Sequence, residues 1–240
     1  MTTTPTAWPE QLRLPGQAAA APGPVDMSVM YVMHHAFRRD LADLAAAAAA
    51  TPASDRVTWA VLAAHWELFS TVLHHHHSGE DAGLWPALLT RCEATERATL
   101  DAMEAEHARI DPLLAACGAG FARLADRADD DARAALAVRL CAARQLLGEH
   151  LRHEETEAIP MIQRLLTPQE WEAIEHEHFR EGMGLRQTLA VVPWALHRVP
   201  GHALRRLFSL PGGGAHRLLW SLTRRRFARR TAIAFRYLER

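Results

Sequence analysis

Apolar stretches rich in alanine and leucine run through most of the chain, and short segments containing proline, glycine, serine or threonine separate them. Alanine and leucine are strong helix formers, so this pattern predicts an all-α protein. The four long helices expected from it span about residues 27–50, 55–86, 92–117 and 129–166. Four such helices with short connections form an up-down-up-down four-helix bundle, whose interior can hold a metal site.

Individual residues set the expected limits of this bundle, which we place at residues 26–166. Asp26 stands where an N-cap would begin the first helix, because its carboxylate can accept hydrogen bonds from free backbone N–H groups. Gly118 and Gly120 are expected to end the third helix. The preceding residues 1–25 are rich in Thr, Ala, Pro and Gly, and we expect them to form a disordered, mobile N-terminal arm.

Two further segments are expected beyond the bundle. The sequence Thr-Pro-Gln-Glu at 167–170 combines a capping threonine, a proline in the first turn and a glutamate at the third position. This combination predicts an extra helix over residues 167–191. Residues 192–240 form a C-terminal helical extension, which prolines and glycines divide before a last helix at about 215–238.

The formal net charge of −1 hides an asymmetry between the C-terminal extension and the rest of the chain. Residues 192–240 carry 11 Arg against Glu239 alone, whereas residues 1–191 carry 16 Arg against 27 acidic residues. The leading interpretation is that the extension packs its apolar face on the bundle while its arginines pair with acidic groups there. Peripheral membrane contact is the second interpretation. Nucleic acid is not expected, because no recognisable binding motif accompanies the charge.

The cysteines and the apolar runs bear on the compartment. Cys92, Cys117 and Cys141 include no CxxC pair and no even set, which argues against a disulfide framework or a thiolate metal site. The chain carries no basic-then-apolar leader and no run of 18 apolar residues, so neither secretion nor membrane spanning is expected. We therefore expect a cytoplasmic location.

One pattern of His, Glu and Pro occurs twice, and a shift of 73–74 residues superimposes the two copies. The superimposed pairs are His34 and His107, His76 and His150, Glu80 and Glu154, and Pro86 and Pro160. A single His followed four residues later by an acid is weak evidence, because 15 His and 28 acidic residues would give roughly two such matches by chance. The doubling at fixed offsets is the specific signal.

This spacing has a direct chemical meaning. Residues four apart on a helix lie on one face, so the His and Glu of each copy point into the same volume. Imidazole nitrogen together with carboxylate oxygen suits iron, manganese or zinc better than calcium or magnesium. Two helix pairs would thus form a site for two metal ions. The six candidate ligands are His34, His76, Glu80, His107, His150 and Glu154.

The other histidines near the doubled pattern are not expected to be metal ligands. The repeat offset favours His34 over the neighbouring His35, and only His76 of the run at 74–77 has Glu80 four residues later. Residues expected to face solvent or to contact a ligand residue are His74, His75, His77, His153 and Glu155. His176 and His178 lie outside the repeat and are expected at the surface.

These segments together resemble the bacterial hemerythrin-like, or HHE cation-binding, family over about residues 27–166. The matching segments are residues 34–41, 76–86, 106–107 and 150–160. The resemblance implies a non-haem di-iron centre in a four-helix bundle, with the four histidines as terminal ligands and the two glutamates as bridges. Asp111 stands where oxygen-carrying members have a further histidine, so it is a candidate for an additional ligand. Tyr31 and Glu104 are two other candidates, because each lies three residues before a candidate histidine and on the same helix face.

The functions that this resemblance implies involve a small diatomic or peroxide ligand. The leading hypothesis is a protein that binds, senses or reductively removes O2, peroxide or nitric oxide. The alternative is an iron-responsive protein whose bundle is ordered by metal, without turnover. A zinc or manganese site without a redox role is a third interpretation.

A rival fold is the ferritin-like di-iron bundle, which uses Glu-x-x-His motifs on two helices. Glu104 with His107, and Glu175 with His178, match that template. The rival leaves the doubled pattern of His, Glu and Pro unexplained, so the sequence favours the hemerythrin-like interpretation.

Overall fold

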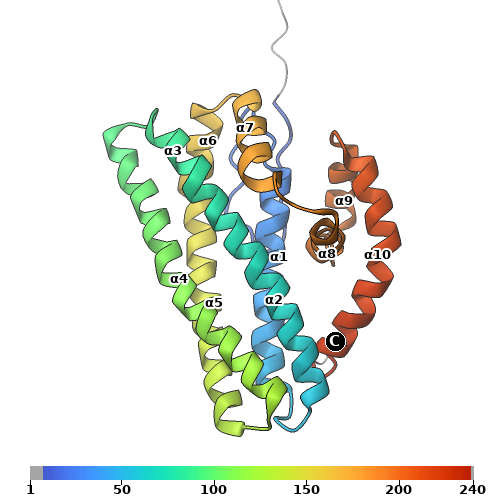
Figure 1. Ribbon diagram of the computed structural model, residues 1–240. Helices are drawn as coiled ribbons and strands as arrows, with labels where there is room; N and C mark the ends of the chain where they lie inside the picture. Colours follow the sequence, from blue (N-terminus) through green and yellow to red (C-terminus); the bar gives the residue numbers. More distant parts are fainter. Residues whose placement is uncertain (1–7, 239–240) are drawn as a thin grey trace, which may run out of the picture.

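The computed structural model describes residues 8–238, which contain helices and irregular segments and no strand (Figure 1). Four long helices lie side by side and are continued by two short ones. They are α1 (Ser28–Ala50), α2 (Arg56–Gly79) with α3 (Trp85–Leu89), α4 (Ala94–Asp126), and α5 (Asp130–His153) with α6 (Ile159–Leu165). The main packing partners are α2 with α4, α1 with α5, and α4 with α5. The prediction of an all-α bundle with additional C-terminal helices is confirmed.

Capping side chains set several of the helix starts. Asp55 accepts a hydrogen bond from the backbone N–H of Thr58 before α2, and Asp129 does the same for Ala132 before α5. The first helix differs slightly from expectation, because Met27 occupies the N-cap position. Asp26 still accepts a hydrogen bond, at 2.9 Å, from the N–H of Ser28.

The predicted end of the third helix at Gly118 and Gly120 is wrong, because α4 continues to Asp126. Both glycines lie at close helix contacts. A Cβ atom at Gly118 would stand 3.1 Å from Nε1 of Trp66, and one at Gly120 would stand 3.0 Å from Cδ1 of Leu136. Packing against α2 and α5 therefore keeps these glycines in a helix that their intrinsic propensity disfavours.

Two apolar clusters fill the bundle, and a polar layer separates them. On α1, Tyr31 belongs to one cluster and Phe37 to the other, with His34 between them. The same order holds on α4, where His107 lies between Met103 and Ile110. The candidate ligands are therefore enclosed in the bundle between two dry regions, away from bulk water.

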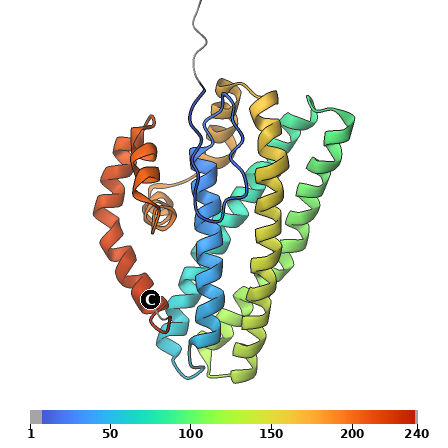
Figure 2. The same cartoon turned by 180° about the vertical axis from the view of Figure 1, so that it is seen from behind.

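The N-terminal segment departs from expectation. Residues 8–25 are not a mobile arm but follow an irregular path over α1 beside α5 and α6 (Figure 2). Leu12, Leu14 and Val25 are buried in the apolar cluster of Tyr31. The amide side chain of Gln163 holds both the N–H and the C=O of Val25, at 3.0 and 2.9 Å. Residues 1–7, the remainder of the expected arm, lie outside the described range.

The extra helix predicted over 167–191 is divided into two. The capping box of Thr167 and Glu170 forms as expected and begins α7 (Pro168–Ile174). A wide π-helical turn, η3 (Glu175–Arg180), then leads to Gly182, whose φ of +83° reverses the chain. A separate helix, α8 (Leu185–Ala195), follows. The expectation of one continuous helix was therefore wrong, although Gly182 and Gly184 mark the break in the sequence.

The C-terminal extension packs along the outside of the bundle through α8, α9 (Gly201–Ser209) and α10 (Gly213–Ala234). Trp194 anchors it, because its buried ring lies 5.6 Å from that of Phe37 and its Nε1 donates to the buried carboxylate of Asp40. The other carboxylate oxygen of Asp40 accepts from Arg39. None of the helices within residues 8–238 has the length and apolarity needed to cross a membrane.

Candidate metal centre

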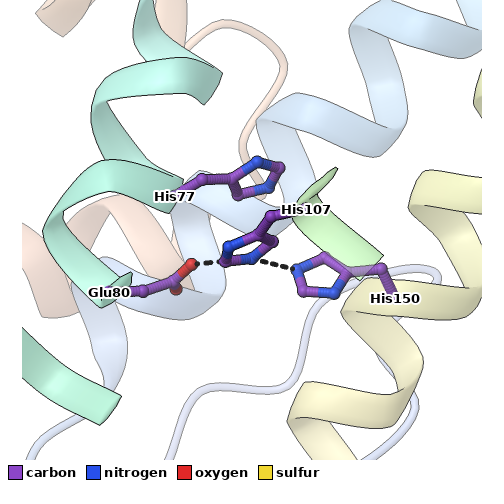
Figure 3. A group of neighbouring side chains, drawn as sticks. All are labelled: His77, Glu80, His107 and His150. Carbon is purple, nitrogen blue, oxygen red and sulfur yellow. Dashed lines mark hydrogen bonds and ion pairs between the residues drawn. The ribbon is translucent and has the colours of Figure 1, made fainter. Parts of the chain in front are cut away.

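Two adjoining groups of buried side chains meet in the polar layer of the bundle. The His34 group consists of His34, His76, Glu80 and Glu154. The His107 group consists of His77, Glu80, His107 and His150 (Figure 3). Within each group the potential ligand atoms lie within 4.8 Å of one another, and Glu80 belongs to both. All six residues selected from the sequence are therefore brought together, and His77 joins them.

The helix carrying each glutamate widens at that residue. A π-helical turn begins at Glu80 (η1, Glu80–Leu84) and another at Glu154 (η2, Glu154–Ala158). In both turns the residue five positions later donates its N–H to the carbonyl of the glutamate. The next residue in each copy is a proline, which has no N–H to continue regular α-helical bonding. The doubled Glu…Pro spacing thus predicts a repeated local distortion, of a kind that is frequent at functional sites.

The distances between potential ligand atoms match shared coordination. His34 Nε2 lies 3.1 Å from Oε2 of Glu154, and His76 Nε2 lies 3.1 Å from Oε1 of Glu80. His107 Nε2 lies 3.5 Å from Oε2 of Glu80. Two ligands held at about 2.1 Å from one ion, at tetrahedral or octahedral angles, stand about 3.0–3.4 Å apart. Both groups therefore have the spacing that a bound cation requires.

Carboxylates fix the orientation of three of these histidines. Nδ1 of His34 lies 2.9 Å from Glu155, Nδ1 of His107 lies 2.8 Å from Asp81, and Nδ1 of His150 lies 2.9 Å from Glu106. An ionised carboxylate only accepts hydrogen bonds, so each Nδ1 donates its proton. Each Nε2 is therefore directed toward the centre of the site, where a metal ion can replace any proton it carries, as in metal-binding histidines held by an outer carboxylate.

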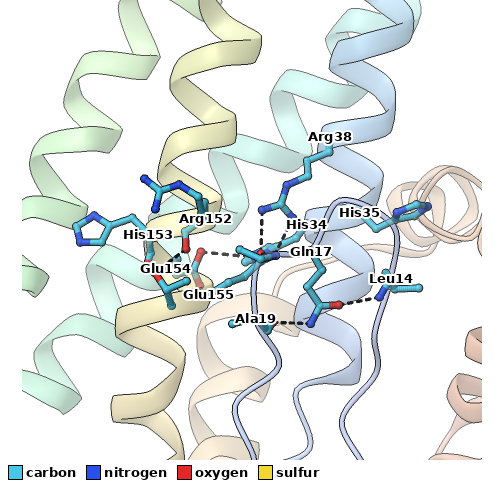
Figure 4. A network of polar contacts seen from close by, with 12 residues as sticks. Leu14, Gln17, Ala19, His34, His35, Arg38, Arg152, His153, Glu154 and Glu155 are labelled. Atoms are coloured by element: carbon cyan, nitrogen blue, oxygen red, sulfur yellow. Dashed lines mark hydrogen bonds and ion pairs between the residues drawn. The ribbon is translucent and has the colours of Figure 1, made fainter.

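Glu155 is the most strongly held of these carboxylates (Figure 4). Arg38 donates to both of its oxygens, at 2.7 and 3.0 Å, and the backbone N–H of Ala18 donates to Oε2 at 2.7 Å. The N-terminal segment thus contacts the side chain that orients His34. Glu155 was expected to contact a ligand residue or face solvent, and it is fully buried in contact with the ligand.

The facing lone pairs are the clearest argument for a cation. Nε2 of His107 and Nε2 of His150 stand 3.2 Å apart, although both histidines use Nδ1 as the donor. Two lone pairs at this distance repel unless a proton or a metal ion lies between them. Buried polar groups that lack partners are rare in proteins. The buried atoms without a hydrogen-bond partner include Nε2 of His34 and His76, both ring nitrogens of His77, and all carboxylate oxygens of Glu80 and Glu154.

The pKa values of the potential ligands also reflect their burial and their mutual charges. Burial, reinforced by the charges of Glu154 and Asp81, raises the pKa of Glu80 well above its usual range. Burial alone would lower the pKa of His34, but the charge of Glu154, together with the charge and hydrogen bond of Glu155, outweighs it and raises that pKa to about 9. His76 has a pKa well below its usual range because of burial and of the positive charge on His34. Protons and metal ions thus compete for the same atoms.

His77 is the ligand candidate that the sequence interpretation missed. It was expected to face solvent or to contact a ligand residue, but its ring is buried and stacks on His107 at 3.9 Å between centroids. Selecting only pairs four residues apart excluded it, although three residues from Glu80 also places it on the same helix face. Its counterpart in the repeat is Leu151, so repetition could not identify it.

The three candidates for an additional ligand occupy different surroundings. Glu104 and Asp111 are exposed and belong to neither group. Tyr31 is buried, its hydroxyl has no hydrogen-bond partner, and burial raises its pKa, as do the charges of Glu155 and Glu154. Tyr31 is the only one of the three that is enclosed with the candidate ligands.

The ferritin-like template does not fit the structure, because both of its glutamates lie outside the two groups of potential ligands. Glu104 is exposed, and Glu175 pairs with Arg180 at the surface. Neither Glu175 nor His178 belongs to a group in residues 8–238 that could hold a metal. The structure therefore favours the ligand set of the doubled pattern.

A short segment covers the helix of His76 and Glu80. A Cβ atom at Gly79 would stand 2.9 Å from the carbonyl oxygen of His178, and one at Gly83 would stand 2.2 Å from Cδ2 of the His178 ring. These glycines allow η3 to lie against α2 and η1. His178 is half-buried there, contrary to expectation, whereas His176 is exposed as expected.

The other histidines near the pattern are held outside the two groups. His75 donates its Nε2 proton to the carbonyl of Phe179 at 2.9 Å. His153 donates to Glu106, the carboxylate that also orients His150. His74 is exposed, as expected, and His35 lies against the N-terminal segment with Nδ1 3.3 Å from the carbonyl of Pro15. The preference for His34 over His35 therefore agrees with the geometry.

One family of known proteins matches this chain. The family model of the hemerythrin HHE cation binding domain matches residues 26–162, which is more than half of the 240 residues. No curated protein and no solved structure matches it. The matched range covers the bundle and every member of both groups, and it ends before α7.

Proposed function

The chain belongs to the hemerythrin HHE cation binding family, and from this premise we propose that it is a non-haem di-iron protein. Its role in this proposal is to bind, sense or reductively remove O2, peroxide or nitric oxide. The observation that carries the proposal is the sharing of Glu80 between two adjoining groups of potential ligands. A carboxylate shared in this way holds two metal ions close enough to act on one small molecule.

The donor set supports iron over calcium or magnesium. The His34 group offers two imidazoles and two carboxylates, and the His107 group offers three imidazoles and one carboxylate, which are donors that suit iron. Bound iron would supply the electrons and the open position that reduction of a small oxidant requires. His34, His76, His77, His107 and His150 would serve as terminal ligands. Glu80 would contribute to both metal sites, and Glu154 would contribute to the site of the His34 group.

The surrounding residues have separate tasks in this proposal. Glu155, Asp81 and Glu106 hold protons on the Nδ1 atoms, which keeps each Nε2 available and increases its basicity. Apolar rings exclude water, since Phe37 and Phe179 lie 5.2 and 5.9 Å from the ring of His76. A dry site of this kind admits small uncharged molecules more readily than ions.

The test is the metal content of the purified, untagged chain, read beside its visible absorption. We expect about two irons per chain and absorption bands that bleach on anaerobic reduction and return in air. Zinc or manganese, or substoichiometric iron without a spectral change, would contradict the redox role.

A second candidate function is iron sensing without turnover. The N-terminal segment contacts Glu155, which in turn holds His34, so metal at His34 and docking of residues 8–25 stabilise each other. A sensor is expected to become cleavable by protease within residues 8–25 when iron is removed. An enzyme is expected to consume peroxide or nitric oxide with equal protection in both states.

The proposed compartment is the cytoplasm. The three cysteines Cys92, Cys117 and Cys141 are unpaired thiols, and the cytoplasm keeps both thiols and ferrous iron reduced. Recovery of the protein in the soluble cytoplasmic fraction, or with the inner face of a membrane, checks this assignment.

A further inference from the structure

Helix α10 is the outermost helix on its side of the molecule, and it packs inward on α8, α2 and α9 (Figures 1 and 2). Its inner face carries Phe227, Thr231 and Ala234, which are buried or half-buried. Phe227 packs against the main apolar cluster, and its ring lies 6.0 Å from that of His65. The helix is thus held in place by one face, and the opposite face is turned away from the bundle.

The outward face combines apolar and basic side chains. Leu218, Leu222 and Ile233 are 63%, 72% and 43% exposed. The spacing of Leu218, Leu222, Arg225, Arg229 and Ile233, three or four residues at each step, places them along one face of the helix. Large apolar side chains rarely gather at a surface unless something covers them.

The arginines of this helix are not used by the bundle. Within residues 8–238, the arginines of the extension that form ion pairs are Arg198, Arg206 and Arg236, whose partners are Asp43, Asp26 and Asp55. The six arginines of Gly213–Ala234 form no ion pair with any residue that the structure describes, and that helix contains no acidic residue. The expectation that the extension's arginines answer the acidic bundle therefore holds for three residues and is wrong for α10.

We propose that the outward face of α10 binds the surface of an anionic membrane. On this face the guanidinium groups would meet the anionic headgroups, while Leu218, Leu222 and Ile233 beside them would enter the acyl boundary. This inference is independent of the metal centre.

Two other occupants fit the face less well. The phosphate backbone of a nucleic acid would meet the arginines but would leave Leu218 and Leu222 without an apolar partner. A second copy of the chain would bring the same apolar residues on its own α10, but pairing the two helices would also place their arginines against one another, and like charges repel.

The test is co-sedimentation of the full chain with vesicles of phosphatidylcholine alone or with about one third phosphatidylglycerol, at about 0.1 M and about 0.5 M salt. We expect binding to the anionic vesicles only, and weaker binding at the higher salt. Replacing Arg225 and Arg229 by Ala should weaken binding roughly 30-fold, at about five-fold for each arginine near an anionic surface. Leu218→Ser with Leu222→Ser should weaken it about ten-fold or more.

The matched control is the double variant Arg139→Ala, Arg144→Ala, which removes two exposed arginines from α5 and should bind like the unaltered chain. All variants should keep the thermal unfolding midpoint and metal content of the unaltered chain. The proposal is overturned if the chain does not bind anionic vesicles, or if the control variant weakens binding as much as the variant of Arg225 and Arg229. It is also overturned if the leucine variant binds as tightly as the unaltered chain. Binding of duplex DNA without vesicle binding, or self-association through this face without it, would equally overturn the proposal in favour of those partners.

Discussion

The His34 group and the His107 group are built from equivalent positions of a repeat, yet they differ in their ligands. His34 and His76 superimpose on His107 and His150, but His77 superimposes on Leu151, so only the His107 group has a third imidazole. The His34 group has a second carboxylate instead. A more oxygen-rich ligand set favours ferric iron, so the two halves of the centre are expected to hold metal with different affinity and redox preference.

The residues around the two groups also differ between equivalent positions of the repeat. Tyr31, beside the His34 group, is buried, whereas its counterpart Glu104 is exposed. Gly83 is covered by η3, whereas its counterpart Glu157 is exposed. The repeat thus fixes where ligands stand, and residues that break the repeat decide how each half of the centre differs from the other.

The largest effect is expected from removing what the two groups share. If the chain holds iron as proposed, Glu80→Ala should remove most of it, because both groups lose a carboxylate at once. Metal analysis of the purified variant measures this. Glu104→Ala, an exposed carboxylate on α4, is the control and should keep the full complement. Retention of both irons without Glu80 would contradict the shared role.

The second prediction removes the third imidazole, which only the His107 group has. His77→Leu introduces the residue that stands at the equivalent position, and it should roughly halve the iron content by weakening the His107 group selectively. His74→Leu changes an exposed histidine on the same helix and should have no effect. An unaltered iron content and spectrum in the His77 variant would show that this imidazole is not a ligand.

The third prediction compares the two carboxylates that hold equivalent histidines. Glu155→Gln and Asp81→Asn should each weaken metal binding, by about 10–100-fold for the removal of such a partner. Glu155 should have the larger effect, because its side chain is 0% exposed and pairs with Arg38, whereas that of Asp81 is 36% exposed. Competition with a chelator measures both. Equal losses would mean that burial and Arg38 add nothing.

The smallest effect is expected at the covering segment. Gly83→Ala forces the ring of His178 to move, and overpacking of this kind costs about 1–3 kcal/mol of unfolding free energy. The ring is half-buried and can rotate, so we expect the lower end, about 1 kcal/mol, with the iron content unchanged. Denaturant unfolding checks this, with Gly148→Ala as the control because a Cβ there meets no neighbour within 4 Å.

The sequence could predict the bundle and six members of the two groups, because a His and an acid four residues apart become a specific signal when they occur twice at a fixed offset. His77 escaped because it lacks a counterpart, although its spacing from Glu80 was available. The repeat also marks Asp81 and Glu155, because an acidic residue follows the glutamate in both copies. Their task could not be predicted, because which histidine each one holds depends on how the helices are arranged.

Other features could not be predicted from the sequence, because contacts between distant residues determine them. Leu12 and Leu14 are isolated apolar residues in a segment of low helix propensity, and only the tertiary contacts reveal that they are buried. Gly118 and Gly120 resemble a helix end, yet close packing of neighbouring helices overrides their propensity. Local rules therefore failed where long-range contacts decide the conformation.

The crossing of carboxylates between the two copies has a consequence for robustness. Glu155 of the second copy orients His34 of the first, and Asp81 of the first orients His107 of the second. A duplicated unit ordinarily provides a spare, so that damage to one copy leaves the other intact. Here neither copy is a spare, because a lesion in either one appears at a histidine of the other.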